Sequence, residues 1–293
     1  MPISALKDIN IFRTSGKFDW WSHADVAERN GISRITCLEE AINWQEVPQR
    51  QSESNLRLPL SGIANVPGHG QINCGHIDMG KLERDSTIKA IPANVVGRVK
   101  NIQAHKVDVP IGLPGMNIGF SLLPSDSKNA SLISKIVAGN IVGPADDPTF
   151  IIHPYYKITG FSFKGSKGHK DTDAKGIKVG YSPVFTIGSA NVICKFVKLI
   201  VCNKGKDIKI EEPTTIPCDY SYSAIIYTMK PVFGDVSSKE NNNPLGKWIA
   251  RDSNKLVSCG VISGCYSAEE AKNLFGINHE DVAGGKVVTK AKK

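Results

Sequence analysis

The chain has 293 residues, of which 41% are hydrophobic and 22% are charged, as in a soluble globular protein. No apolar run reaches transmembrane length and no signal-peptide pattern is present, so we expect no membrane partner. The net charge of +8 favours a polyanionic partner, usually nucleic acid, and a merely soluble basic protein is an equal alternative from charge alone.

The seven cysteines are odd in number and include no C-x-x-C pair. We therefore expect neither a disulfide framework nor a zinc site, and we expect a reducing compartment, the cytoplasm. His69, His76 and Asp78 lie close in the sequence, but no further ligand follows at regular spacing, so we expect no metal site.

The first 55 residues resemble the tail of a larger domain. Residues 2–6 are typical of the end of a strand that runs into a loop, without an earlier strand for it to pair with. Residues 35–44 have apolar positions at helical spacing, with Thr36 and Glu39 placed for a capping box. Residues 45–55 are polar, contain a proline and predict a linker.

From residue 56 onward, short runs of β-branched and apolar residues alternate with Gly and Pro, and no helix-length pattern occurs as far as residue 145. Strands about eight to twelve residues apart, separated by turn signals, predict an antiparallel barrel. A second series of the same kind continues to residue 266. Residues 267–293 begin with a short helical pattern and finish in a basic tail that we expect to be mobile.

Residues 75–81 fit G-x-x-x-x-G-K, the pattern of a phosphate-binding loop, but three features argue against that function. The residue after Lys81 is Leu82, whereas the motif needs Ser or Thr to ligate Mg²⁺. Residues 71–74 alternate polar and apolar, as in a half-exposed strand, although a buried strand should precede the loop. The other nucleotide-binding signals, at residues 4–5 and 203–207, stand in the wrong order. We interpret residues 68–92 as the first hairpin of a barrel.

Several short motifs together are similar to the eukaryotic elongation factor 1-alpha family, the cytosolic counterpart of elongation factor Tu. In chain order they are LRLPL at 56–60, the stretch 68–92, PGMNIGF at 114–120, GYSPV at 180–184, ANVICKF at 190–196, PLGKWIARD at 244–252 and GVI at 260–262. Each motif is short, but their order and spacing are specific. The resemblance covers nearly the whole chain and the C-terminal two thirds of the family's length.

The resemblance implies a mainly β fold: two consecutive antiparallel β-barrels of the family's second and third domains, preceded by a short α/β remnant of a GTPase domain. The implied segments are 1–55 for the remnant and linker, 56–147 and 148–266 for the barrels, and 267–293 for the basic tail. The chain would then be a fragment, a truncated gene product or a degenerate paralogue.

The resemblance also implies contacts with RNA on the first barrel, where the family holds the aminoacylated end of tRNA in a shallow pocket. The pocket's Glu falls on Gln103, its basic position on Lys106, and its Asn on Asn117. For Gln103 the alternative is an exposed strand residue. For Asn117 the alternative is a residue that shapes the turn at 114–119, since Asn tolerates unusual backbone angles.

On the second barrel, Lys195 and Arg251 lie in matched segments and are candidates for contact with the tRNA backbone. The alternative for Arg251 is an ion pair with Asp252 or another carboxylate. The family's His falls on Asn191, which leaves the role of that position open. Ser4, Ala5 and Leu6 are similar to the last guanine-nucleotide loop of the family.

By family, the function is delivery of aminoacyl-tRNA to the ribosome with GTP and Mg²⁺, with an exchange-factor subunit as a further partner. This chain alone is expected neither to bind nor to hydrolyse GTP, because the phosphate loop, Mg²⁺ ligands and switch segments are lacking, and we predict no catalytic residue. One alternative is a GTP-independent module that binds tRNA, the ribosome or the exchange factor. Another is a structural or cytoskeletal interaction protein.

Overall fold

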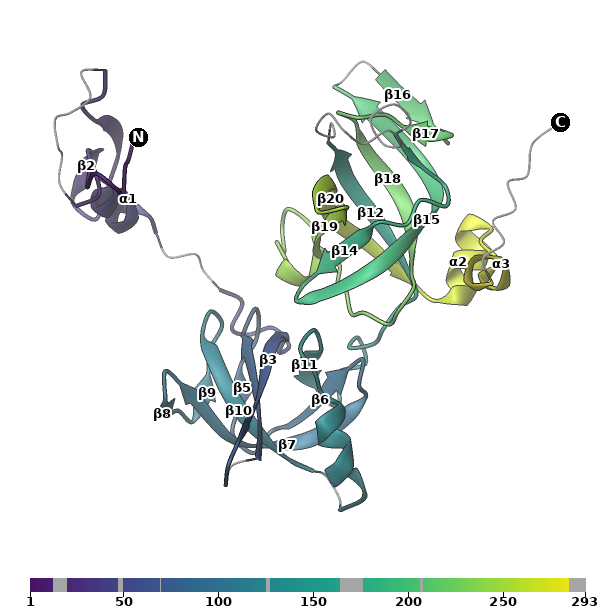
Figure 1. Cartoon of the computed structure of the whole chain (residues 1–293), viewed down its shortest axis with the longest axis horizontal. Coiled ribbons are helices and arrows are strands. Elements are labelled where there is room, and N and C mark those ends of the chain that lie inside the picture. The colour runs from purple at the N-terminus through teal and green to yellow at the C-terminus, as the bar shows by residue number, and fades with distance from the viewer. Residues whose placement is uncertain are drawn as a thin grey trace. The chain divides into compact units, whose positions relative to one another are not determined.

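The computed structural model describes residues 1–12, 20–46, 50–68, 70–124, 127–163, 176–205 and 208–284, with the side chains of 127–130 excepted. The chain divides into two compact units, Met1–Gln49 and Arg50–Lys293. Figure 1 shows the first unit as a small α/β element and the second as two β-barrels with a helical C-terminal segment. Within the described residues, no helix has the length and apolar character needed to cross a membrane.

The first unit consists of a hairpin and one short helix. Strands β1 (Ala24–Arg29) and β2 (Ile32–Ile35) pair antiparallel, and α1 (Leu38–Trp44) follows. The predicted capping box between Thr36 and Glu39 is wrong by one residue. The helix begins after Cys37, so Glu40 occupies its third position and accepts hydrogen bonds from the amide and hydroxyl of Thr36 at 2.6 and 2.8 Å.

Six antiparallel strands close the first barrel. In order around the ring they are β3 (Leu58–Val66), β4 (Gly70–His76), β10 (Asn117–Pro124), β7 (Val95–Ala104), β6 (Thr87–Ile91) and β11 (Ile141–Pro144). The short strand β8 (Val107–Asp108) pairs antiparallel with the end of β7, and β5 (Leu82–Glu83) pairs with β9 (Ile111–Gly112). The 3-10 helix η1 (Ser127–Lys135) connects β10 to β11. Inward side chains such as Leu58, Val99 and Phe120 fill the core, because alternate residues of each strand point inward.

The second barrel is also a closed ring of six antiparallel strands. They are β12 (Tyr155–Ser162), β18 (Ser221–Thr228), β15 (Ala190–Lys204), β14 (Val184–Ile187), β19 (Lys247–Asp252) and β20 (Lys255–Tyr266). Strand β16 (Ile208–Glu211) pairs antiparallel with the end of β15. The short strands β13 (Ile177–Lys178) and β17 (Thr215–Ile216) form a separate two-stranded sheet, and η2 (Pro244–Gly246) precedes β19. Aromatic side chains including Phe185, Phe196 and Trp248 fill this core.

These strands confirm the predicted fold class, two antiparallel barrels after a short α/β part. Two details differ from the sequence predictions. Strand β4 pairs with β3 and β10 and not with the strand that follows it, so residues 68–92 contain only the second half of the first hairpin. The prediction of no helix between 56 and 145 also missed η1, a nine-residue 3-10 helix.

The segment after the second barrel is folded as far as residue 284. Helix α2 (Ala268–Phe275) begins with a capping box between Ser267 and Glu270, and α3 (His279–Ala283) follows a left-handed turn at Gly276. Both helices pack on the outer face of the barrel, where Ala271 and Ile277 are buried with Tyr155 and Ile225. The basic residues 285–293 of the predicted mobile tail lie outside the described residues.

Candidate nucleic-acid interface

The segment that resembles a phosphate loop lies in the wall of the first barrel. Gly75 pairs with Ile118 inside an antiparallel sheet, and the chain passes through Lys81 directly into β5. The Lys81 ammonium lies 2.7 Å from the carboxylate of Glu53, and this hydrogen bond lowers the pKa of Glu53. A phosphate loop needs a following helix whose N-terminus faces the phosphates. Residues 75–81 therefore do not fit a GTP phosphate site.

On the outer face of the first barrel, the structure brings Gln103 and Asn117 near each other. Gln103 on β7 stands opposite Gly119 on β10, and Asn117 is two residues before Gly119, so both side chains share the outward side. The amide of Gln103 donates to Asp108 at 2.8 Å. Asn117 Oδ1 lies 3.1 Å from Nδ1 of His76, its partner across β4 and β10.

Small residues occupy the surface between these polar groups. Gly119 pairs with Cys74 across β10 and β4, and Cys74 pairs with Gly62 across β4 and β3, so small residues occupy adjacent outward positions. A Cβ at Gly119 would lie 3.1 Å from a methyl group of Ile72. A flat ring can rest on such a floor while amide groups at its edge donate and accept hydrogen bonds.

Lys106 lies beside this surface and not on it. His105 and Lys106 form the two-residue turn between β7 and β8, with φ angles of 51° and 67°. Both residues therefore occupy the left-handed region, which a two-residue hairpin of this type requires at both positions. The exposed Lys106 side chain starts from the tip of the hairpin that carries Gln103.

The alternative interpretation of Asn117 as a turn residue is not supported by its backbone. Gly115, with a φ of 94°, supplies the unusual angle in that turn, whereas Asn117 is the first residue of β10. The sequence did not indicate the contacts of His76 with Asn117 and of Asp108 with Gln103, because both depend on strand register. Asp78, close to His76, has a raised pKa because it is buried, although the charges of His76 and Arg50 oppose the shift.

On the second barrel, Arg251 binds neutral side chains. Its Nη2 donates to Thr186 Oγ1 at 2.9 Å and to Asn191 Oδ1 at 3.4 Å, and Thr186 donates to Asn191 at 2.7 Å. The alternative of an ion pair with Asp252 is wrong, because that carboxylate accepts from Tyr181 and the exposed Arg251 side chain forms no salt bridge within the described part of the chain.

The second predicted residue, Lys195, shares this outer face with Arg251. Along β15, Asn191, Ile193 and Lys195 alternate with the buried residues of the core. Val184 on β14 stands between Ile193 and Arg251, since it pairs with both. The face is thus a sheet surface with two cations and with exposed apolar side chains between them, which suits a partner that is both charged and flat.

Ser4, Ala5 and Leu6 lie in the first unit. Ser4 and Ile9 exchange two backbone hydrogen bonds of 3.1 and 3.0 Å around a tight turn, and Leu6 at its tip is 96% exposed. His69, which was considered with His76 and Asp78 as a possible metal ligand, falls outside the described residues. Among those that are described, no group of three metal-ligating side chains is brought together.

The family described as GTP-eEF1A C-terminal domain-like matches residues 172–263, which fall mainly in the second barrel. Elongation factor 1-alpha of Encephalitozoon cuniculi is 27% identical over 100% of this chain and 59% of that protein. Elongation factor 1-alpha-A of Schizosaccharomyces pombe is 28% identical over 89% of this chain and 54% of that protein. The chain therefore spans a little over half the length of these relatives.

Among solved structures, Sup35 in complex with GDP is similar in fold, with a TM-score of 0.63 and 17% identity over 91% of this chain and 59% of that one. Sup35 in complex with GMPPNP gives a TM-score of 0.64 and 18% identity over 91% of this chain and 58% of that one. At this identity the likeness concerns the fold alone. Along its whole length the chain is thus similar to elongation factor 1-alpha, and its second barrel carries the match to the C-terminal-domain family.

Proposed function

We propose that this chain binds aminoacyl-tRNA in translation elongation and delivers it to the ribosome. The observation that carries the proposal is the outer face of the first barrel, where Gln103, Asn117 and His76 surround a floor of small residues. The terminal adenine would lie on that floor near Gly119. Its edge would meet the amides of Gln103 and Asn117, and its phosphate would meet Lys106.

The second barrel would hold the tRNA backbone. Arg251, oriented by Thr186 and Asn191, and Lys195 would each neutralise a phosphate, which adds affinity that falls with salt. For this function we propose four segments: residues 1–55 as the remnant of a GTP-binding domain and linker, 56–147 and 148–266 as tRNA-binding barrels, and 267–293 as an accessory segment. Ser4, Ala5 and Leu6 would be the nucleotide-facing loop of the first segment.

GTP, Mg²⁺ and an exchange-factor subunit enter this proposal through the family. The contact of Lys81 with Glu53, and the strand that follows it, favour tRNA binding by the two barrels without a nucleotide held at residues 75–81. We propose a cytoplasmic location, where the partners of a translation factor lie. The second candidate function for this chain is therefore a module that binds tRNA, the ribosome or the exchange factor without GTP. The two candidates differ in whether GTP changes the affinity for tRNA.

Filter binding of charged and deacylated tRNA to the whole chain tests the proposal. We expect charged tRNA to bind at least tenfold more tightly, and Asn117→Ala and Gln103→Ala to reduce that preference. Asn65→Ala, which removes an exposed amide elsewhere on the first barrel, is the matched control. Equal, weak and salt-sensitive binding of both tRNAs would instead indicate mere attraction of a polyanion.

A further inference from the structure

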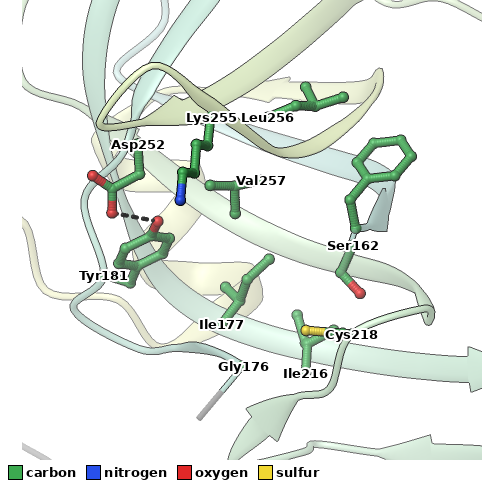
Figure 2. Close-up of a pocket in the computed structure, with 11 residues that line it drawn as sticks. Ser162, Gly176, Ile177, Tyr181, Ile216, Cys218, Asp252, Lys255, Leu256 and Val257 are labelled. Carbon is green, nitrogen blue, oxygen red and sulfur yellow. Dashed lines mark hydrogen bonds between the residues drawn. The ribbon is translucent and has the colours of Figure 1, made fainter. Parts of the chain in front are cut away.

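One end of the second barrel contains a pocket whose lining includes none of the residues proposed to bind tRNA. Figure 2 shows it between the β19–β20 hairpin and the short β13–β17 pair. Its floor is apolar and consists of Ile177, Ile216, Cys218 and Val257. Ile177 and Ile216 belong to the barrel core, so the floor continues into the packed interior.

The walls of the pocket are fixed by local structure. Ser162 donates to the carbonyl of Pro217 at 2.6 Å and ties the end of β12 to the segment before Cys218. Gly176 has a φ of 64°, and a Cβ there would collide with the carbonyl oxygen of Ile216, so only glycine allows β13 to approach β17 this closely. The pocket is therefore largely preformed, as small-molecule sites usually are.

Polar groups gather at one end of the pocket. The Tyr181 hydroxyl donates to Asp252 at 2.9 Å, and Ser253 donates to the other carboxylate oxygen at 3.1 Å. Burial and the bond to Asp252 raise the pKa of Tyr181, which keeps its hydroxyl protonated and committed to this bond. The carboxylate is thus already supplied with two donors.

For Lys255, the described part of the chain supplies no carboxylate partner. Its half-buried side chain lines the pocket, and Figure 2 shows its ammonium group beside the Tyr181–Asp252 pair. No carboxylate of the described residues lies within 4.0 Å of it. An apolar floor with a cation that pairs with none of the described carboxylates is complementary to a molecule that has an apolar body and one anionic group.

We propose that this pocket binds a small amphiphilic organic acid, with its ring or chain on Ile177, Ile216 and Val257 and its carboxylate on Lys255. The site shares no residue with the proposed tRNA interface, so its existence does not depend on that function. An acid of about eleven heavy atoms should bind with a Kd near 1 mM, given the usual binding free energy per atom.

The probe is 3-phenylpropionate, titrated onto the full chain and followed by ligand-observed NMR. Its matched competitor is 3-phenylpropylamine, which has the same ring and chain but the opposite charge. We expect saturable binding of the acid, and binding of the amine at least fivefold weaker. Lys255→Gln should weaken the acid about fivefold and remove the preference, because it deletes the cation and leaves a neutral polar side chain.

Lys247→Gln, an exposed lysine on β19 outside the pocket, is the control and should leave the titration unchanged. A second readout locates the site: the acid should slow alkylation of Cys218 by a maleimide, measured by mass spectrometry of the tryptic peptide, and leave Cys74 in the first barrel unaffected. Tighter binding of the amine, an unchanged affinity in Lys255→Gln, or unslowed alkylation of Cys218 at saturating acid would each overturn the proposal.

Discussion

Arg57 and Asp147 form a buried ion pair, with 2.9 Å between Nη2 and Oδ2 and with side chains only 5% and 2% exposed. Asp147 lies just after β11, and Arg57 stands at the start of the first barrel. The guanidinium also lies over the rings of Phe150 and Phe233, at 4.9 and 5.5 Å. Phe150 lies in the segment that joins the two barrels, and Phe233 follows β18 of the second barrel. The side chain of Arg57, at the start of the first barrel, thus contacts both the joining segment and the second barrel.

The first prediction is that Asp147→Asn lowers the stability of the two-barrel unit by about 3–5 kcal/mol, because it leaves Arg57 charged, buried and without its carboxylate. Asp235, 3.8 Å from Nε of Arg57, can compensate only in part. Urea unfolding of the full chain measures the loss. The control is Asp85→Asn, which removes an exposed partner of Arg98 and should change stability by less than about 1 kcal/mol.

The same pair sets a pH dependence. Burial opposes ionisation of Asp147, but hydrogen bonds from Thr149 and Arg57 outweigh it, and the pKa falls below its ordinary value of 3.8. A lowered folded-state pKa means that the stabilisation is present above pH 3.8 and is lost as pH falls further. The difference between wild type and Asp147→Asn should therefore shrink below that pH. A difference that stays constant down to pH 2 would contradict this account.

The sequence predicts the barrels because their alternation is local. In β7, buried and outward residues alternate over most of ten positions. Whether a residue is apolar or polar therefore indicates which side of the sheet it faces. The Arg57–Asp147 pair joins residues that are 90 positions apart, and no local period signals it. The one-residue error at α1 has a similar origin, since the choice between Glu39 and Glu40 depends on where the helix begins.

The second prediction concerns Gly260, which packs under an indole ring. A Cβ there would meet the carbonyl oxygen of Thr159 and would lie 2.8 Å from the Trp248 ring. Gly260→Ala should therefore destabilise the second barrel by about 1–3 kcal/mol, as measured by thermal unfolding. Gly62→Ala is the control, because a Cβ at that strand position meets no atom within 4 Å. Similar melting temperatures for the two variants would show that the barrel accommodates the methyl group.

The third prediction is that the C-terminal helices detach in alkali. The Tyr155 hydroxyl is hydrogen-bonded to Nδ1 of His279 at 2.9 Å, and burial raises the pKa of Tyr155 to about 12. A raised folded-state pKa gives stability that is full below pH 10 and lost as pH rises toward 12. Hydrogen exchange of α2 and α3 (His279–Ala283) should therefore accelerate in that window.

Tyr155→Phe separates this effect from general alkaline unfolding. At pH 8 the variant should expose the helices more often than wild type, by about 1 kcal/mol for one lost hydrogen bond. Between pH 10 and 12 the two proteins should converge, since the phenylalanine has no proton to lose. If wild type and variant respond to alkali in parallel, Tyr155 is not the group that titrates.

Less of the candidate interface than of the fold could be predicted. Gln103 and Asn117 were found through resemblance, and their proximity depends on a register between β7 and β10 that includes a bulge after Ser121. The contact of Asn117 with His76 needs a third strand, β4, to be in register as well. The role of Asn191 could not be foreseen either, because its partners Thr186 and Arg251 come from two other strands.

The fourth prediction tests that arrangement under the proposed tRNA function. Arg251→Gln should reduce the slope of log affinity against log salt by about 1, because one phosphate contact is lost. Asn191→Ala should weaken binding at low salt and leave the slope unchanged, since the charge remains and only its orientation by a hydrogen bond is lost. The control, Lys178→Gln, removes an exposed lysine from β13 and should alter neither quantity. An unchanged slope in Arg251→Gln would remove this residue from the interface.

The fifth prediction concerns Lys81 and nucleotide. In a phosphate loop, replacing the lysine removes the cation that holds the β- and γ-phosphates, and nucleotide affinity falls sharply. Here the ammonium is bonded to Glu53, whose side chain is 84% exposed, and the next element is a strand. Lys81→Met should therefore leave the result of a GTP titration of the full chain the same as in wild type. It should also change stability by less than about 1 kcal/mol, because exposed pairs contribute little. Loss of nucleotide binding in this variant alone would mean that Lys81 meets a phosphate, and the barrel-wall interpretation of residues 75–81 would then be wrong.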